Sequence, residues 1–290
     1  MTGTVRPRTA AARFALACVL ATAVSEPAAQ VKPSRIVSIV PSATEMLFAI
    51  GAGPRVVGVS SFDDHPAEVA AVERVGGLID PSLERILALR PDLVVVYGTQ
   101  RELRAQLDRA GIAQFPYVNT DMAGVTRTMR ELGARLGLEA EAGRAADTFE
   151  ARLAAVRARV AGRPRPRVLM IFGHDPGSLR NLDAVGGVGF HHDMIGIAGA
   201  TNALADIHRA TVPLSSEEIR RIGPDAIVDL HYGAALNADL AGERALWNRL
   251  GAIPAVKAGR VHLLTGDEFV VPGPRLAAAT ERLAQALHPE

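Results

Sequence analysis

Cysteine is almost absent: the 290 residues contain one, Cys18. It lies in an N-terminal segment that we expect to be removed, so the mature chain would have no thiol and no disulfide. Basic and acidic residues nearly cancel, 32 against 31, and therefore indicate neither nucleic acid nor an anionic membrane as partner. No run of 18 apolar residues occurs in the body of the chain, which predicts no internal membrane span.

Signature motifs of common enzymes are also missing. No P-loop, His-Glu-x-x-His or Gly-x-Ser-x-Gly sequence occurs. Gly51-Ala52-Gly53 follows a predicted helix, whereas a dinucleotide loop follows a strand, and Gly186-Gly187-Val188-Gly189 lacks the third glycine at its spacing. An α/β enzyme dependent on a metal or a nucleotide remains as an alternative.

Residues 1–30 have the layout of a signal peptide. Three arginines precede a short apolar run, 14–24, and small residues follow it. This predicts export to the periplasm with cleavage of the segment. A disordered tail and an uncleaved anchor are alternatives; a lipid anchor at Cys18 is disfavoured because too little apolar sequence precedes it.

One sequence pattern occurs twice, at 82–96 and at 215–229. Aligned on Pro91 and Pro224, each copy predicts a Ser N-cap, a short helix, a Pro-Asp turn and a buried strand. Two similar lobes would explain the repetition; chance similarity between helix–turn–strand units is the alternative.

Helices alternate with short apolar strands throughout, which favours parallel sheets covered by helices. In such sheets ligands bind beyond the carboxyl ends of the strands. In the first half, the loops at that edge are 41–42, 60–66, 97–100 and 119–121.

A long helix is predicted from Glu139 to Val160. Apolar residues recur along it at spacings of three and four and form one stripe. The predicted fold is α/β, with two Rossmann-like lobes of parallel sheet, 31–138 and 164–290, joined by one backbone helix, 139–163. An ordinary packing helix within a single domain is the alternative.

Several segments together resemble a known family: 35–45, 57–60, 83–92, 198–202 and the second Ser-x-Glu unit. They are similar to the cobalamin-, haem- and siderophore-binding periplasmic proteins of ATP-binding-cassette importers. The resemblance implies two lobes joined by a single long helix. It also implies that the protein is not an enzyme but captures a bulky metal chelate between the lobes and delivers it to a membrane permease.

The resemblance assigns a docking role to Glu84 and Glu217, which match the glutamates that pair with permease arginines in cobalamin-binding members. Each lies seven residues before the proline of its repeat. Near a helix start, a carboxylate also gains about 0.3–1 kcal/mol from the helix dipole, which is a sufficient local explanation.

The resemblance, together with the predicted strand-end positions, also gives a set of ligand-binding residues. Any of three histidines could be the axial ligand of a haem iron or a cobalt; otherwise the protein alone would hold no metal. The set is Ser42, Phe62, His65, Tyr97, His174, His231, Tyr232, Asp267 and Phe269, with His65, His174 and His231 as the possible axial ligands.

A cobalamin-type corrinoid is the favoured ligand, and haem or a ferric siderophore is the alternative. Leu78 and Thr211 stand where cobalamin binders carry tryptophans, which keeps the alternatives open. No intrinsic cofactor, no nucleic acid and a monomeric state are expected. A sensor or scaffold on the same fold, with no importer, is a further alternative.

Two other features have structural interpretations. Trp247, the only tryptophan, is predicted to lie in the core, and His191-His192-Asp193 is predicted to begin a helix rather than to bind a metal.

Overall fold

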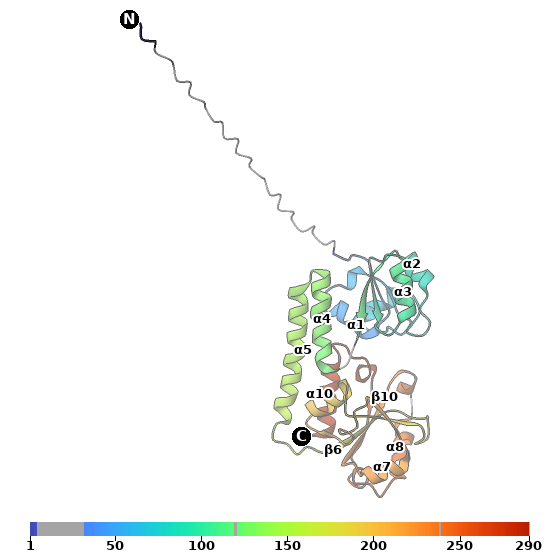
Figure 1. Cartoon of the computed structure of the whole chain (residues 1–290). Coiled ribbons are helices and arrows are strands. Elements are labelled where there is room, and N and C mark those ends of the chain that lie inside the picture. The colour runs from blue at the N-terminus through green and yellow to red at the C-terminus, as the bar shows by residue number, and fades with distance from the viewer. Residues whose placement is uncertain (5–31, 119–120, 238, 290) are drawn as a thin grey trace. The chain divides into compact units, whose positions relative to one another are not determined.

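The computed structural model describes residues 1–4, 32–118, 121–237 and 239–289. The predicted signal peptide, 1–30, lies outside them except for its first four residues. Residues 32–290 form one compact unit, which contains two β-sheets flanked by helices (Figure 1). None of the described helices has the length and apolarity needed to cross a membrane.

The first sheet has five strands, all parallel, in the order β3-β2-β1-β4-β5. Each connection between consecutive strands contains a helix, as parallel pairing requires. The strands are β1 (Ile36–Ser38), β2 (Val56–Val59), β3 (Glu73–Arg74), β4 (Leu93–Tyr97) and β5 (Ala113–Tyr117).

The second sheet is mixed, and here the prediction of two parallel sheets is wrong. Strand β7 runs antiparallel to both β6 and β9. Only eight residues, 174–181, separate β6 from β7, and a parallel crossover needs a dozen or more. The order is β11-β10-β6-β7-β9, with β8 beside β6. The strands are β6 (Arg167–Gly173), β7 (Leu182–Val185), β8 (Thr201–Asn202), β9 (Thr211–Leu214), β10 (Ala226–His231) and β11 (Val261–Thr265).

The repeated pattern makes the same contacts in both halves. Asp92 accepts the backbone N–H of Arg35 at 3.0 Å, and Asp225 accepts that of Arg167 at 2.8 Å. Each arginine also donates to a backbone carbonyl at the end of the helix in its repeat. Arg35 donates to the carbonyl of Leu89, and Arg167 donates to that of Ile222.

The strand register repeats as well. Ile36 lies opposite Leu93, and Val168 lies opposite Ala226. The two copies are therefore equivalent units of two similar lobes, and chance similarity does not account for them.

Ten α-helices are described. Four short 3₁₀ helices accompany them: η1 (Gly53–Arg55), η2 (Ala67–Ala71), η3 (Gly233–Asn237) and η4 (Asp267–Phe269). The α-helices are α1 (Pro41–Ala49), α2 (Leu83–Ala88), α3 (Arg101–Arg109), α4 (Met122–Leu136), α5 (Glu139–Val160), α6 (Phe190–Ile197), α7 (Ser216–Ile222), α8 (Leu240–Asn248), α9 (Pro254–Lys257) and α10 (Leu276–Leu287).

Helix α5 is the longest of these, with 22 residues, about 33 Å at 1.5 Å per residue. Its buried residues are those of the predicted stripe, from Ala142 to Val160. Arg130 of α4 pairs with Asp147 and Glu150 of α5, and Arg152 of α5 pairs with Glu281 of α10. The helix therefore packs against both halves of the chain (Figure 1).

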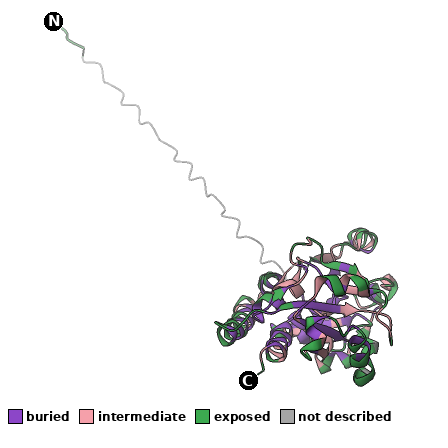
Figure 2. Ribbon diagram, turned by 90° about the horizontal axis from the view of Figure 1, so that it is seen from below, coloured by how far each residue is buried: buried purple, intermediate pink, exposed green. Residues whose placement is uncertain are grey.

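The core consists of two clusters. The larger contains the interior of the first sheet, one face of the second sheet, α5 and α10. The smaller covers the other face of the second sheet and includes Trp247, whose predicted burial is confirmed at 0% exposure. Figure 2 shows buried strands at the centre and exposed residues on the outer helix faces.

Candidate functional site

Exposed apolar side chains gather at the carboxyl edge of the first sheet. Phe62 follows β2 and is 70% exposed, Leu78 and Ile79 follow β3, and Val118 follows β5. An ideal Cβ placed on Gly77 would lie 2.5 Å from the Phe62 ring, so the ring lies directly against a glycine backbone. Large apolar groups left in water at one edge mark a surface that contacts something else.

Two further predicted site residues lie at the same edge. Tyr97, the last residue of β4, is half-buried and packs edge-to-face with Tyr117 at 6.2 Å between ring centroids. His65 lines a cavity of about 270 Å³ together with Glu45 and Arg275. Burial and the positive charge of Arg275 lower the pKa of His65, which favours the neutral imidazole.

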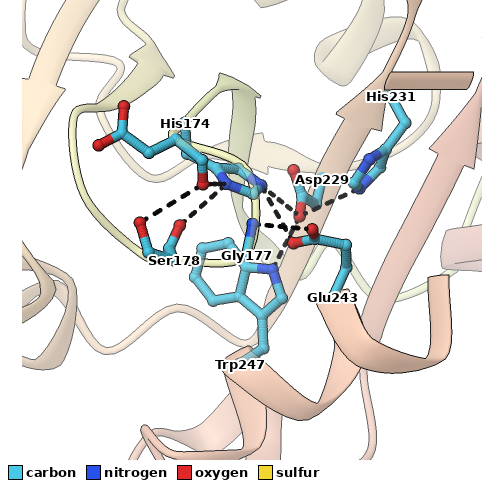
Figure 3. Close-up of polar contacts among 8 residues, drawn as sticks. His174, Gly177, Ser178, Asp229, His231, Glu243 and Trp247 are labelled. Carbon is cyan, nitrogen blue, oxygen red and sulfur yellow. Dashed lines mark hydrogen bonds and ion pairs between the residues drawn. The ribbon is translucent and has the colours of Figure 1, made fainter. Parts of the chain in front are cut away.

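His174 and His231 point away from any open surface. They converge on Asp229, with Nε2 to Oδ2 distances of 3.3 Å and 3.4 Å (Figure 3). The side chains of both histidines are at most 7% exposed. The structure therefore brings these two predicted residues together, but into a buried cluster that also includes Glu243 and Trp247.

The charge states in this cluster are coupled. The Asp229 carboxylate raises the pKa of His174 to about 9. Burial opposes ionisation of Asp229, but the hydrogen bonds from His174 and Trp247 and the close contact with His231 outweigh it and lower its pKa to about 2. The carboxylate is thus charged although none of its surface is exposed.

The remaining predicted ligand contacts differ in accessibility. Tyr232 is half-buried, and Asp267 is held by its Oδ1, which accepts the backbone N–H of Gly233 at 2.7 Å. Ser42 is 4% exposed within α1, and Phe269 is fully buried, with the Arg282 guanidinium 4.9 Å from its ring centre. The burial of Ser42 and Phe269 disagrees with the prediction that they contact a ligand.

His191-His192-Asp193 begin α6, as predicted. Their side chains bind different partners: His191 Nε2 lies 2.8 Å from the Phe269 carbonyl oxygen, and Asp193 accepts the backbone N–H of Met122. Burial lowers the pKa of His191 to about 4. These residues join structural elements and do not form a common ligand set.

Glu84 and Glu217 occupy equivalent exposed positions. Each is the second residue of its helix, α2 or α7, after a Ser N-cap. In α7 the capping box is completed by Glu218, so Glu217 is not needed for it. Neither glutamate belongs to an ion pair among the described residues.

The sequence profile of the periplasmic binding protein family matches residues 36–268. The chain belongs to this family. The chain is 31% identical over 255 residues to the vitamin B12-binding protein of Salmonella typhimurium (strain LT2), covering 87% of this chain and 90% of that one. It is 29% identical over 267 residues to an uncharacterized ABC transporter substrate-binding lipoprotein, YvrC, of Bacillus subtilis (strain 168), covering 89% and 81%.

A solved structure has the same fold. The periplasmic heme binding protein from Pseudomonas aeruginosa matches with a TM-score of 0.75 and 26% identity, covering 89% of this chain and 94% of that one. The predicted family and the two-lobed α/β fold are thus confirmed. The alternative of an enzyme receives no support from these relatives.

The sequence analysis did not identify Asp229 and Glu243 as members of the buried cluster. Asp229 could have been noticed as the one acid within the apolar strand Ala226–His231, because a buried charge needs a partner. Nothing near Glu243 in the sequence indicates that α8 brings it to the same place.

Proposed function

We propose that the protein is the extracytoplasmic substrate-binding component of an ATP-binding-cassette importer, and that it captures a bulky metal chelate between its two lobes. The observation that carries this proposal is the exposed apolar edge of the first sheet, formed by Phe62, Leu78, Ile79 and Val118. Ligand pockets are predominantly apolar with a few polar anchors, and a flat macrocycle would stack on the Phe62 ring.

The carboxyl ends of the strands in the first lobe face the second lobe. Tyr117, at the end of β5, lies with its hydroxyl 3.5 Å from the Pro272 carbonyl oxygen, and Pro272 follows β11 and η4. The carboxyl edge of the first sheet therefore faces the segment that leaves the carboxyl edge of the second. A ligand held there would touch Phe62, Tyr97 and His65 from one lobe and Tyr232 from the other.

A cobalamin-type corrinoid is the chelate we favour. The relative with 31% identity is a vitamin B12-binding protein. In addition, His174 and His231 are turned into a buried cluster, which argues against either as an axial ligand of a haem iron. Haem is the second candidate, because the solved relative from Pseudomonas aeruginosa is a heme binding protein.

The test is a spectrum followed by titration. The protein, isolated from its own periplasm, is expected to show corrinoid absorption bands; haem or siderophore bands would change the ligand but keep the importer class. Replacement of Phe62 by alanine should weaken binding by about 2–13-fold, given about 0.5–1.5 kcal/mol for an aromatic contact. Leu87→Ala, at another exposed apolar site on α2, should leave affinity unchanged. If none of the three chelates binds, the proposal is wrong.

Delivery to the permease would use Glu84 and Glu217. Two equivalent carboxylates, one on each lobe, suit arginines presented by a two-fold symmetric permease. The double variant Glu84→Lys/Glu217→Lys should abolish stimulation of the importer ATPase and keep ligand affinity. The matched control Glu102→Lys/Glu139→Lys reverses charge at first-turn positions of α3 and α5. If both double variants stimulate the importer ATPase equally, Glu84 and Glu217 have no docking role, and a sensor or scaffold function is favoured.

Export and a monomeric state complete the proposal. Residues 1–30 would act as the cleaved signal, and the bound chelate would be cargo rather than an intrinsic cofactor. The relative from Bacillus subtilis is a lipoprotein, so mass spectrometry of the mature N-terminus separates cleavage from lipid attachment at Cys18.

A further inference from the structure

Four potential metal ligands meet in a buried cluster of the second lobe. His174 comes from the loop after β6, Asp229 and His231 from β10, and Glu243 from α8 (Figure 3). Asp229 is fully buried, and His231 is 3% exposed. Among the described residues, three atoms of this cluster are buried without a hydrogen-bond partner: Asp229 Oδ1, His231 Nε2 and Glu243 Oε2. A buried polar atom without a partner is costly, and an ion bound by His231 Nε2 and Glu243 Oε2 would satisfy two of these three.

The two histidine distances to Asp229 fit ligands that share a cation better than direct charge-assisted hydrogen bonds, whereas Glu243 lies farther out. His174 Nε2 and His231 Nε2 lie 3.3 Å and 3.4 Å from Asp229 Oδ2, and His174 Nε2 lies 3.9 Å from Glu243 Oε2. Charge-assisted N–H···O bonds are shorter, about 2.7–2.9 Å. A tetrahedron with bonds of about 2.0–2.1 Å to its centre has edges of about 3.3–3.4 Å.

Outer contacts hold these side chains in position for coordination. His174 Nδ1 lies 3.0 Å from the carbonyl oxygens of both Asp175 and Ser178, which fixes its proton on Nδ1 and aims Nε2 into the cluster. Trp247 Nε1 donates to Asp229 at 2.8 Å, and the backbone N–H of Gly177 donates to Glu243 Oε1 at 3.2 Å. Metal-binding histidines and carboxylates are commonly supported by hydrogen bonds of this kind.

The fold itself does not require the cluster. The first lobe has an equivalent position for three of these residues, found by counting from the equivalent pairs Arg35/Arg167 and Asp92/Asp225. Ser42 is equivalent to His174. Val96 is equivalent to Asp229, and Gly98 is equivalent to His231. These small or apolar residues support the same strands without buried charge. The second lobe therefore carries a polar set that its architecture does not explain.

We propose that His174 Nε2, Asp229 Oδ2, His231 Nε2 and Glu243 Oε2 bind one Zn²⁺ ion, at a site separate from the chelate held between the lobes. Two imidazoles and two carboxylates are zinc ligands in proteins. The two negative charges match the charge of the ion, so that the buried carboxylates are neutralised. The site does not depend on the identity of the chelate and would stabilise the second lobe.

The test measures zinc on the chelate-free protein. After treatment with a chelator, incubation with Zn²⁺ and dialysis, the wild type should retain one zinc per chain by mass spectrometry and should melt at a higher temperature than the metal-free protein. Co²⁺ in its place should give the intense visible bands of a four-coordinate ion. His231→Gln should lower Zn²⁺ affinity by at least the ~10–100-fold that losing an outer-shell partner costs.

Two further variants keep the result interpretable. Glu243→Gln, at the 10% exposed rim of the cluster, serves if His231→Gln does not fold, and should also weaken zinc binding. His208→Gln removes an exposed histidine elsewhere and should retain zinc like the wild type. The proposal is overturned if the wild type retains no zinc. In that case, protonated histidines that pair with the carboxylates would explain the cluster. The proposal is also overturned if Glu243→Gln and His208→Gln retain zinc equally.

Discussion

Asp63 should make the protein less stable as pH rises from about 4 to 7. The carboxyl group is 3% exposed, and its Oδ2 accepts the backbone N–H of Ser60 at 2.7 Å. The guanidinium of Arg74 lies nearby but donates to the backbone carbonyls of Ser60 and Asp63, not to the carboxylate. Glu45 and Tyr97 also face this group. Burial raises the pKa of Asp63 to about 7.

The direction follows from proton binding. The unfolded chain loses the Asp63 proton near pH 3.8, whereas the folded protein keeps it until about pH 7. Between these values the folded state binds more protons, so the free energy of unfolding falls as pH rises. At about 1.36 kcal/mol per pH unit, the loss is at most about 4 kcal/mol over the whole window and about 2–3 kcal/mol between pH 5 and 7.

The assay compares Asp63→Asn with the wild type. The asparagine keeps an acceptor for the Ser60 N–H but cannot ionise. Urea unfolding followed by circular dichroism should show the variant gaining about 2–3 kcal/mol relative to the wild type between pH 5 and 7. Asp64→Asn, at the exposed neighbouring residue, should show no such trend. A difference between Asp63→Asn and the wild type that stays constant with pH refutes the reasoning.

Three substitutions test other contacts. Phe269→Ala should lower the free energy of unfolding by about 3–5 kcal/mol, as measured by urea; a loss of ligand affinity with unchanged stability would restore its predicted role at the ligand. Ser215→Ala should cost about 1 kcal/mol because it removes the capping box with Glu218, and an unchanged midpoint would contradict this. Glu45→Ala should cost up to about 3–5 kcal/mol, because it breaks a buried pair with Arg275 at 2.6 Å; a melting temperature equal to that of the wild type would show that the pair contributes nothing.

The sequence predicted those parts of the fold that depend on local pattern. The stripe of α5 has helical spacing, and the two Ser-capped repeats each carry their own start and turn signals. The antiparallel strands β7 and β9 were not predicted, because β9 is short and pairs with a strand about 25 residues away. No local signal marks such a pairing.

The site was harder to predict than the fold for a physical reason. His174 and Asp229 are 55 residues apart in the sequence, and Glu243 approaches them only because α8 packs on one face of the second sheet. The sequence shows only that His65 and His174 both lie in loops that follow a strand. Only the packing distinguishes His65, which is exposed, from His174, whose side chain is 7% exposed.

The two lobes show which residues belong to the scaffold and which to the task of each lobe. Asp92 and Asp225 make the same contact at the amino ends of their strands, because both copies must join a helix to a parallel strand. At the carboxyl ends the copies diverge, with Val96 in one and Asp229 in the other. Ligands bind at that edge in open α/β sheets. The exposed apolar edge of the first lobe and the buried charged cluster of the second thus occupy strand ends of one shared scaffold, and a shared fold cannot by itself identify what either lobe binds.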